Sequence, residues 1–253
     1  MKRYAILGVG VDSLSSEEFL LRARTHLDSK SQSQIVTVNP EFIMEARANE
    51  RFRTVLNAAP LALADGFGLI VASFILFSKN VFHRMAGVQA TLLLAGIAAE
   101  LDRSVYLVGA REGVALLAAE TLKKRYPSLR IVGAEVGIPF DSSKTPSEHT
   151  DDLLTRITTS QPAILFVAFG APKQEIWISE NLSRMPSVKI AMGVGGTFDY
   201  LSGAVAYAPS WIRHCGLEWL YRLIREPHRL NRIITATIRF PLAVLFSKLD
   251  KRD

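Results

Sequence analysis

One carboxylate stands in an otherwise apolar stretch of the sequence. Asp65 opens the segment DGFG (residues 65–68), which follows LALA and precedes LIVASFILF. Burial of a charge costs free energy, so an acid in this setting is either neutralised by a partner or kept for its chemistry. Desolvation raises the proton affinity of a carboxylate, which makes Asp65 a candidate general base. The structural alternative is that Asp65 caps the helix predicted to begin near Gly66.

Polar residues follow other apolar runs in the same way. Thr37 and Asn39 lie in TVNPE (37–41), and FGAPKQE (169–175) brings a lysine, an amide and a carboxylate together. Thr37 and Asn39 are equally suited to cap a helix that starts near Pro40, a residue favoured in the first helical turn. The polar part of FGAPKQE is compatible with a solvated first turn. Its compact polar run before Trp177 favours a functional loop instead.

Several of these segments are rich in glycine. GAREG (109–113), FGAPKQE and GGTFD (195–199) each follow an apolar run. Glycine lets backbone amides approach a ligand closely, and amides at helix N-termini favour anions, so these loops are candidates for binding a diphosphate. Ordinary tight turns are an equally good explanation of any one loop. The candidate residues are Gly109, Ala110, Gly170, Ala171, Pro172, Lys173, Gln174, Glu175, Gly195 and Gly196.

Other nucleotide and nucleophile motifs are incomplete or missing. GVGVDS has Ser13 where a dinucleotide fingerprint needs its third glycine. The sequence contains no Gly-Lys dipeptide for a P-loop and no G-x-S-x-G for a nucleophile elbow. It also has no D-x-D segment, the usual metal-holding motif of sugar transfer from nucleotides. We therefore expect arginines, rather than a metal, to stabilise the charge on a departing diphosphate.

The arginines available for this task lie in the basic C-terminal part. Residues 208–253 carry nine Lys or Arg against four acids, so +5 of the net charge of +6 is there. Arg222 and Arg225 are three residues apart on one predicted helical face, with Arg213 as a third candidate, and guanidinium groups offer forked donors to phosphate oxygens. The alternative is a solvated basic face. Such a charge distribution predicts an anionic partner.

The elements that must position these residues alternate in type. Short apolar runs predict strands at 4–7, 34–38, 61–64, 104–108, 130–134, 163–168 and 189–194, with helical patterns between them. This pattern is typical of an α/β fold, a Rossmann-like, mostly parallel sheet with helices on both faces. Ligands of such sheets bind beyond the carboxyl ends of the strands, where the polar segments lie.

Two parts of the chain are predicted. Residues 1–207 form the α/β catalytic domain, and residues 208–253 form a C-terminal helical, basic and amphipathic appendage. The chain of 253 residues is 49% hydrophobic and has one cysteine, Cys215, which excludes an internal disulfide or a multi-cysteine zinc site. No metal and no cofactor are expected.

The end of the appendage has the pattern of an interfacial helix. Apolar residues follow helical spacing from Leu230, while Arg229, Arg232 and Arg239 share another face. Pro241 is expected to kink this helix. No apolar run reaches the ~20 residues of a membrane span, so we expect a cytoplasmic enzyme, peripheral on the anionic inner face of the cell membrane. An oligomer contact or core packing is the alternative, and homo-oligomers are therefore possible. The apolar residues of this stripe are Ile233, Ile234, Ile238, Leu242, Leu245, Phe246 and Leu249.

Taken together, the motifs resemble those of the WecG/TagA/CpsF glycosyltransferase family. The segments that carry the resemblance are TVNPE, DGFG, LVGAREGV, FGAPKQEIW, GVGGTFDYLSG and GLEWLYRLIREPHRL, in this order. The resemblance implies an inverting hexosyltransferase of bacterial surface polysaccharide synthesis (teichoic acid, common antigen or exopolysaccharide). Such an enzyme moves an N-acetylmannosamine-type or related sugar from a UDP donor to a polyprenyl-diphosphate-linked amino sugar.

The resemblance also implies roles for residues. Asp65 matches the family's proposed base, with Thr37, Asn39 and Gln174 in the donor pocket and Arg84 as a further pocket arginine. The sequence departs from the family pattern at Ala86, Gln89 and Tyr207, which leaves the exact sugar and acceptor open.

Two other classes of function compete with this one. A nicotinamide-dependent oxidoreductase would need the missing fingerprint glycine. A nucleic-acid-binding module would use the basic tail, but the aliphatic stripe suits lipid better than stacked bases, so no nucleic acid partner is expected.

Overall fold

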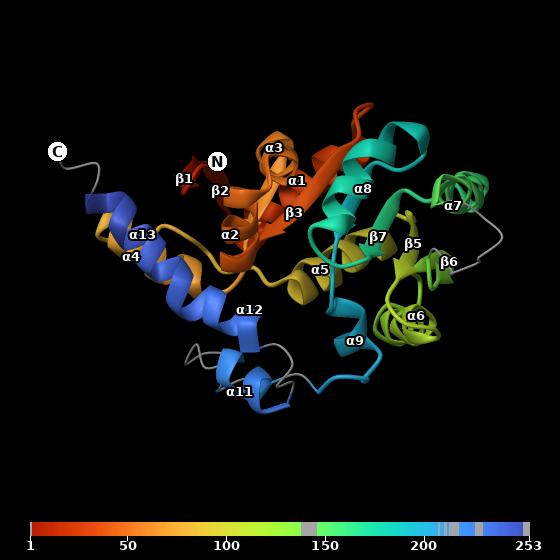
Figure 1. Ribbon diagram of the computed structural model, residues 1–253. Coiled ribbons are helices and arrows are strands. Elements are labelled where there is room, and N and C mark those ends of the chain that lie inside the picture. The colour runs from red at the N-terminus through yellow and green to blue at the C-terminus, as the bar shows by residue number, and fades with distance from the viewer. Residues whose placement is uncertain are drawn as a thin grey trace.

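The strands form one mixed, mostly parallel sheet (Figure 1). The computed structural model describes residues 2–137, 146–206, 208–209, 212, 218–225 and 230–249. Within these residues the sheet has eight strands in the order β1-β2-β4-β3-β8-β7-β5-β6, and only the β1–β2 pair is antiparallel. The strands are β1 (Lys2–Ile6), β2 (Val9–Ser13), β3 (Ser33–Val38), β4 (Leu61–Ala64), β5 (Ser104–Gly109), β6 (Arg130–Glu135), β7 (Ile164–Ala168) and β8 (Ile190–Gly193).

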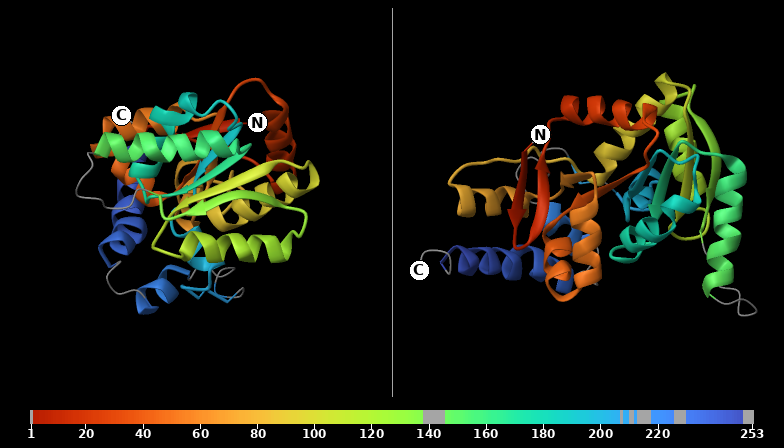
Figure 2. Two further views of the ribbon diagram at one scale, coloured as in Figure 1. Left: turned by 90° about the vertical axis from the view of Figure 1, so that its right-hand side faces the viewer. Right: turned by 90° about the horizontal axis from the view of Figure 1, so that it is seen from above.

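Helices cover both faces of this sheet (Figure 2), which confirms the predicted fold class. The helices on one face are α1 (Ser16–Asp28), α5 (Gly87–Glu100), α6 (Val114–Arg125) and α9 (Thr197–Leu201). The other face is covered by α2 (Pro40–Ala48), α3 (Glu50–Ala58), α4 (Phe67–Phe77), α7 (Pro146–Ser160) and α8 (Lys173–Asn181). The layering follows from β3, where Ile35 packs in one core and Val36 in the other, because successive strand residues point to opposite faces.

All seven predicted strands are present, but β2 was not predicted. The sequence analysis treated GVGVDS as a loop after the first strand, whereas the chain turns at Leu7 and Gly8, both with positive φ, and returns as an antiparallel strand. The acid in this strand, Asp12, is satisfied by its neighbours. Its carboxylate accepts hydrogen bonds from Arg3 Nε (2.7 Å) and from the amide of Ala62 (2.7 Å). A segment that forms a strand cannot be a dinucleotide-binding loop, so the oxidoreductase hypothesis loses its motif.

The two halves of the sheet meet between β3 and β8. From β3 the chain continues to β4 on one side, whereas β8 pairs with β7 on the other. The order of strands therefore reverses at this pair. Crevices at such reversal points, beyond the carboxyl ends of the strands, are where open α/β sheets bind their ligands.

The C-terminal part forms helices that return to the body of the protein. They are α11 (Glu218–Arg225), α12 (Leu230–Ile234) and α13 (Phe240–Leu249), with a π-helical stretch over Thr235–Arg239. The π-helical stretch joins α12 and α13 into one helix, Leu230–Leu249, called the tail helix below. Pro241 lies within it, two residues after the end of the π-helical stretch, where the altered backbone pairing accommodates a residue that lacks an N–H group.

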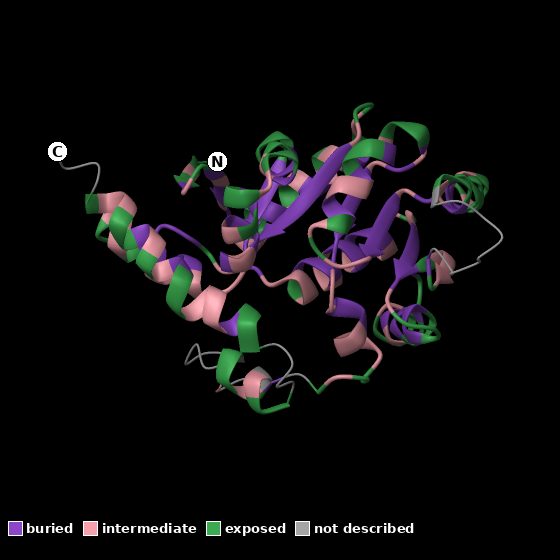
Figure 3. Cartoon of the chain, viewed as in Figure 1, coloured by how far each residue is buried: buried purple, intermediate pink, exposed green. Residues whose placement is uncertain are grey.

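The tail helix packs along α4, and the two lie side by side at one end of the molecule (Figure 1). Ile233, Phe240 and Val244 are buried against the body. The predicted apolar stripe is therefore divided, because Ile233 faces the protein whereas the exposed residues lie on the outer side (Figure 3). The exposed members are Ile238, Leu242, Leu245, Phe246 and Leu249.

By length and composition, the tail helix could cross a membrane. The sequence analysis expected no membrane span, because no uninterrupted apolar run reaches the necessary length, whereas the whole helix of 20 residues is long and apolar enough. Only 17% of its most apolar window is buried, so it differs from the central helix of a soluble core.

Candidate functional site

A cavity of about 830 Å³ opens at the carboxyl edge of the sheet, where β3 and β8 meet. Loops after β3, β4, β7 and β8 form its walls, and Trp219 of α11 and residues of the tail helix line its remaining side. The predicted site residues that line it are Thr37, Asn39, Asp65, Arg84, Ala110, Gly170, Ala171, Gln174, Gly195 and Gly196. Residues that are far apart in the sequence thus share one site.

Asp65 reaches the cavity because β4 ends at Ala64. Its backbone N–H donates to the carbonyl of Val38 (2.7 Å), which holds the exit of β4 against that of β3. Asp65 is not the N-cap residue of α4, because that position is occupied by Gly66, with φ of 89°. The Asp65 side chain is half-buried on the cavity wall. A carboxylate there is accessible to a bound alcohol.

Thr37 and Asn39 occupy the exit of β3. Asn39 caps α2, since its Oδ1 accepts a hydrogen bond from the amide of Phe42 (2.9 Å), so the capping interpretation holds for this residue. Asn39 also lines the cavity, and a cap residue can do both. Thr37 is the last residue but one of β3, and its buried side chain faces the cavity beside Gly87.

Gln174 joins the exits of two neighbouring strands. Its Oε1 accepts hydrogen bonds from the amides of Gly170 (3.0 Å) and Gly195 (3.1 Å), and its Nε2 donates to Glu175 Oε1 (2.6 Å). The sequence analysis expected glycine amides in these loops to face a diphosphate. For Gly170 and Gly195 this is wrong in the present geometry, because Gln174 already accepts both N–H groups.

Glu175 is completely buried and lines neither this cavity nor the smaller one described below. Burial raises the pKa of its carboxyl group to about 7, although the hydrogen bond from Gln174 acts in the opposite direction. Gly193 of β8 lies directly over the acid, where an added Cβ would be 2.5 Å from Glu175 Oε1. The predicted direct contact of Glu175 with a diphosphate is therefore wrong, because the Glu175 side chain is fully buried and lines neither cavity.

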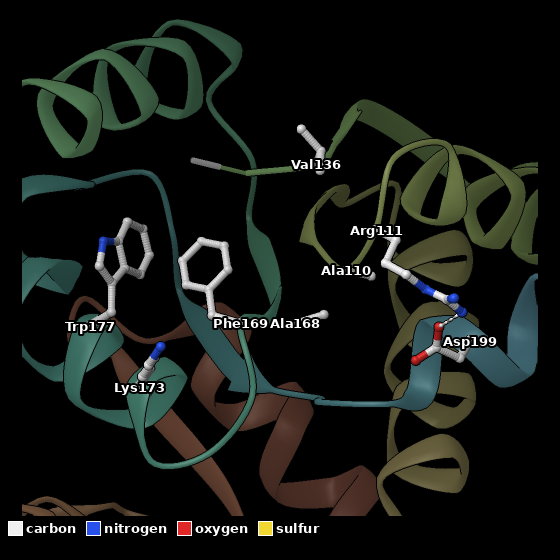
Figure 4. Close-up of a pocket in the computed structure, with 8 residues that line it drawn as sticks. All are labelled: Ala110, Arg111, Val136, Ala168, Phe169, Lys173, Trp177 and Asp199. Atoms are coloured by element: carbon white, nitrogen blue, oxygen red, sulfur yellow. Dashed lines mark hydrogen bonds and ion pairs between the residues drawn. The ribbon is translucent and has the colours of Figure 1, made fainter. Parts of the chain in front are cut away.

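A second cavity of about 500 Å³ adjoins the first (Figure 4). The two share Ala110, Ala168, Phe169 and Asp199. Phe169 and Trp177 meet edge to face, with ring centroids 5.3 Å apart. The sequence analysis missed Trp177, Arg111 and Asp199 as site residues because their contacts come from separate segments. Lys173 lines this smaller cavity, and Arg111 forms an ion pair with Asp199 (3.3 Å) on its other side.

Besides Glu175, two further predicted glycine-loop residues, Gly109 and Pro172, line neither cavity. Gly109, with φ of 111°, lies so close to β7 that a Cβ there would be 2.6 Å from the carbonyl carbon of Ala168. Its role is close strand packing. Pro172 precedes α8 as its N-cap residue, after a cis peptide bond with Ala171.

The predicted arginines have different positions. Arg213 and the side chain of Arg222 lie outside the described residues. Arg225 is exposed, with its guanidinium 5.8 Å from the Tyr221 ring centroid, and does not line the cavity. The tail helix instead contributes Arg232, whose Nε donates to Glu41 (2.6 Å). The sequence analysis missed Arg232 as a site residue and placed it on the lipid-facing side. No local signal marks it, because Glu41 lies 191 residues earlier.

The fold and the cavity together define a doubly wound α/β protein with a polar site at the carboxyl edge of its sheet. The chain belongs to the glycosyl transferase WecG/TagA/CpsF family, whose model matches residues 4–253. It is therefore a glycosyltransferase, as the resemblance implied.

Several relatives share one name, N-acetylglucosaminyldiphosphoundecaprenol N-acetyl-beta-D-mannosaminyltransferase. The protein of Bacillus spizizenii (strain ATCC 23059 / NRRL B-14472 / W23) is 34% identical over 211 residues, which cover 83% of this chain and 78% of the relative. That of Bacillus subtilis (strain 168) is 31% identical over 227 residues, 90% and 84% respectively. That of Staphylococcus aureus (strain MRSA252) is 30% identical over 230 residues, 90% and 87%.

Proposed function

We propose that the protein transfers an N-acetylmannosamine-type sugar from a UDP donor to a polyprenyl-diphosphate-linked N-acetylglucosamine, with inversion at the anomeric carbon. The acceptor and the sugar are those that the names of its relatives state. The observation that carries the proposal is the place of Asp65, a carboxylate on the wall of the large cavity at the reversal point of the sheet. Direct displacement at the anomeric carbon needs a base for the acceptor hydroxyl, and Asp65 is placed to take that proton.

The two adjoining cavities suit the two ends of a nucleotide sugar. Phe169 and Trp177 give the smaller cavity the flat apolar surface that a nucleobase needs. The larger cavity holds the polar residues Thr37, Asn39 and Asp65, which suit the donor sugar and the acceptor hydroxyl. The diphosphate then lies between them, near Ala110 and Asp199, which line both cavities.

Arginines supply positive charge for the departing diphosphate. Arg84 and Arg232 line the large cavity from opposite parts of the chain. A guanidinium offers two parallel N–H donors to phosphate oxygens and stabilises charge that develops during bond cleavage. Since the sequence has no D-x-D segment, we expect transfer without a bound metal.

The outer face of α4 and the tail helix is the surface that we assign to the membrane. Phe67 and Phe74 of α4 and Leu242 and Phe246 of the tail helix are all exposed. Arg239 and Lys248 supply positive charge to the same helix for anionic headgroups. Phe67 and Pro241 also line the cavity, so a lipid carrier could leave the bilayer along this face and place its sugar near Asp65. We therefore propose that the enzyme works on the inner face of the cell membrane.

The proposal is tested by reconstituting the reaction. The enzyme is mixed with UDP-N-acetylmannosamine and polyprenyl-diphosphate-linked N-acetylglucosamine, and the product is analysed by mass spectrometry and by NMR of the anomeric centre. We expect a product one N-acetylhexosamine heavier, with the β configuration. Retention of the donor's configuration would contradict the inverting step, and the absence of any sugar transfer would contradict the donor and acceptor assignment.

A further inference from the structure

The carboxamide of Gln174 holds together two loops that form one wall of the large cavity. These loops leave β7 at Gly170 and β8 at Gly195, and both donate their backbone N–H groups to Gln174 Oε1. Gln174 itself is 2% exposed. The backbone hydrogen bonds between β7 and β8 stop where these strands end, and beyond that point the Gln174 side chain links the two loops instead. The orientation of its carboxamide therefore determines whether both loops are held.

A carboxamide can be rotated by half a turn without a change in shape, so something must select the orientation seen here. Glu175 makes that selection together with the two backbone N–H donors. Glu175 Oε1 accepts a hydrogen bond from Gln174 Nε2 (2.6 Å), and a carboxyl oxygen can accept this bond whether the group is ionised or carries a proton on its other oxygen. In the rotated orientation, the amide oxygen would face the carboxylate while the NH₂ group would face two N–H donors. Both contacts would be repulsive.

The surroundings of Glu175 leave little room for another arrangement. Gly193 of β8 lies so close that an added Cβ would be 2.5 Å from Glu175 Oε1 and 2.7 Å from Gln174 Nε2. The backbone carbonyl of Glu175 is fixed as well, because it accepts a hydrogen bond from Gln34 Nε2 of β3 (2.9 Å). Two neighbouring strands, β3 and β8, therefore hold the acid in its position.

Retaining an acid here costs stability. Glu175 is 0% exposed, and within the described part of the chain its Oε2 has no hydrogen-bond partner. An apolar side chain at this buried position would avoid the cost of desolvating a carboxyl group. Stability alone therefore does not explain the glutamate, whereas the selection of the Gln174 orientation does.

We propose that Glu175 is a positioning residue of the glycosyl transfer site, which acts through Gln174 to fix the Gly170 and Gly195 loops for donor binding. It touches neither donor nor acceptor. The inference rests on the proposed function only for the identity of the donor. The effect on the two loops is independent of any ligand.

The first test measures the loops directly. Hydrogen exchange at the amides of Gly170 and Gly195 is followed by NMR in the wild type, Glu175→Met, Glu175→Gln and Asn181→Ala. Methionine has similar length and accepts no comparable hydrogen bond, whereas glutamine keeps an acceptor oxygen. Asn181 is the matched control, because it is also buried in α8 but lies at the opposite end of the helix.

We expect exchange at both glycine amides to be about tenfold faster or more in Glu175→Met, a factor that corresponds to the loss of one ordinary stabilising interaction. Glu175→Gln and Asn181→Ala should stay within about threefold of the wild type. Wild-type exchange in Glu175→Met would overturn the proposal. Equal acceleration in Asn181→Ala would also overturn it, because the effect would then reflect general destabilisation of α8.

The second test measures UDP binding by calorimetry with the same four proteins. We expect Glu175→Met to raise the Kd for UDP about tenfold, and Glu175→Gln to restore it to within about threefold. A Kd that is the same in Glu175→Met and the wild type would overturn the role in donor binding. A wild type that binds no UDP would contradict the proposed donor instead, and the exchange experiment would still decide whether Glu175 positions the loops.

Discussion

Two acids at the carboxyl edge of the sheet have opposite surroundings. Asp65 is half-buried on the wall of the cavity, whereas Glu175 is fully buried beneath Gly193. Both follow apolar runs, so the sequence makes both of them candidate site residues. What separates them is the depth of burial, which depends on a strand 18 residues further along the chain from Glu175. Residue types therefore mark both acids as candidates, but they do not tell which acid a ligand can reach.

The raised pKa of Glu175 predicts how stability depends on pH. The group has a pKa of about 7 in the folded protein against 4.5 as the ordinary value, so the folded state binds the proton more tightly. The free energy of unfolding should therefore fall as pH rises from about 4.5 to about 7, by up to about 3 kcal/mol, and then level off.

Urea unfolding of the wild type and Glu175→Gln at several pH values measures this effect, since the variant lacks the titrating group. We expect the stability of the wild type relative to the variant to decline across that range. A constant difference between the two proteins would show that burial does not shift this pKa.

Arg232 predicts an effect on donor binding at the same scale. Its guanidinium lines the cavity and pairs with Glu41. Charge-assisted hydrogen bonds to phosphate are worth about 1.5–3 kcal/mol, so Arg232→Ala should raise the Kd for UDP by about tenfold to a hundredfold. Arg239→Ala is the control, because Arg239 is exposed on the same helix and does not line the cavity. Calorimetry that gives equal losses for both variants would argue against a specific contact.

At the scale of elements, hydrophobic periodicity predicted seven of the eight strands that the structure describes. It failed at β2 because VGVDS contains a glycine and an acid, and the acid is satisfied by Arg3 and the amide of Ala62. It also counted Arg232, Arg239 and Pro241 as interruptions of the apolar run, and so did not predict that the whole tail helix is long and apolar enough to cross a membrane. In each case a tertiary contact or a local change of helix type outweighs the intrinsic preference of the residue.

The tail helix and α4 predict lipid binding. The double variant Leu242→Ser with Phe246→Ser removes two exposed apolar side chains from the proposed membrane face. Each buried apolar side chain contributes about 1.5–3 kcal/mol, so co-sedimentation with vesicles that contain anionic lipid should fall at least tenfold.

Leu116→Ser with Leu117→Ser is the matched control for this prediction, because these leucines are equally exposed on α6. Binding of UDP should be unchanged in both double variants. Vesicle binding that survives in the tail variant, or that falls equally in the control, would place the membrane surface elsewhere.

For the whole molecule, the sequence predicted the class of fold and the edge of the sheet where the site lies. Chain order does not determine spatial contacts, and so the approach of Arg232 to Glu41 and the bridge from Gln174 to Gly195 became visible only in the structure. The same holds for the division of the site into two adjoining cavities. The pieces could be predicted because each is local, whereas their assembly depends on packing.

The assembled site also predicts how transfer responds to metal removal. Arg84 of the body and Arg232 of the tail helix both line the large cavity, and we propose that they supply the charge that a metal would otherwise provide. UDP release from UDP-N-acetylmannosamine in the presence of acceptor should therefore persist in excess EDTA, within about twofold of the untreated rate. A loss that added Mg²⁺ or Mn²⁺ restores would show that a metal takes part.

The most direct test of the account is the rate of sugar transfer in Asp65→Asn, with Asp102→Asn as the control. Asparagine keeps the size of the side chain but cannot accept the acceptor's proton, and general bases contribute about a hundredfold to ten-thousandfold. Asp102 is an exposed acid just before β5, at the opposite edge of the sheet. We predict that Asp65→Asn lowers kcat by at least about a hundredfold while UDP binding is retained, and that Asp102→Asn leaves the rate unchanged. Transfer by Asp65→Asn at close to the wild-type rate would contradict the assignment of Asp65 as the base.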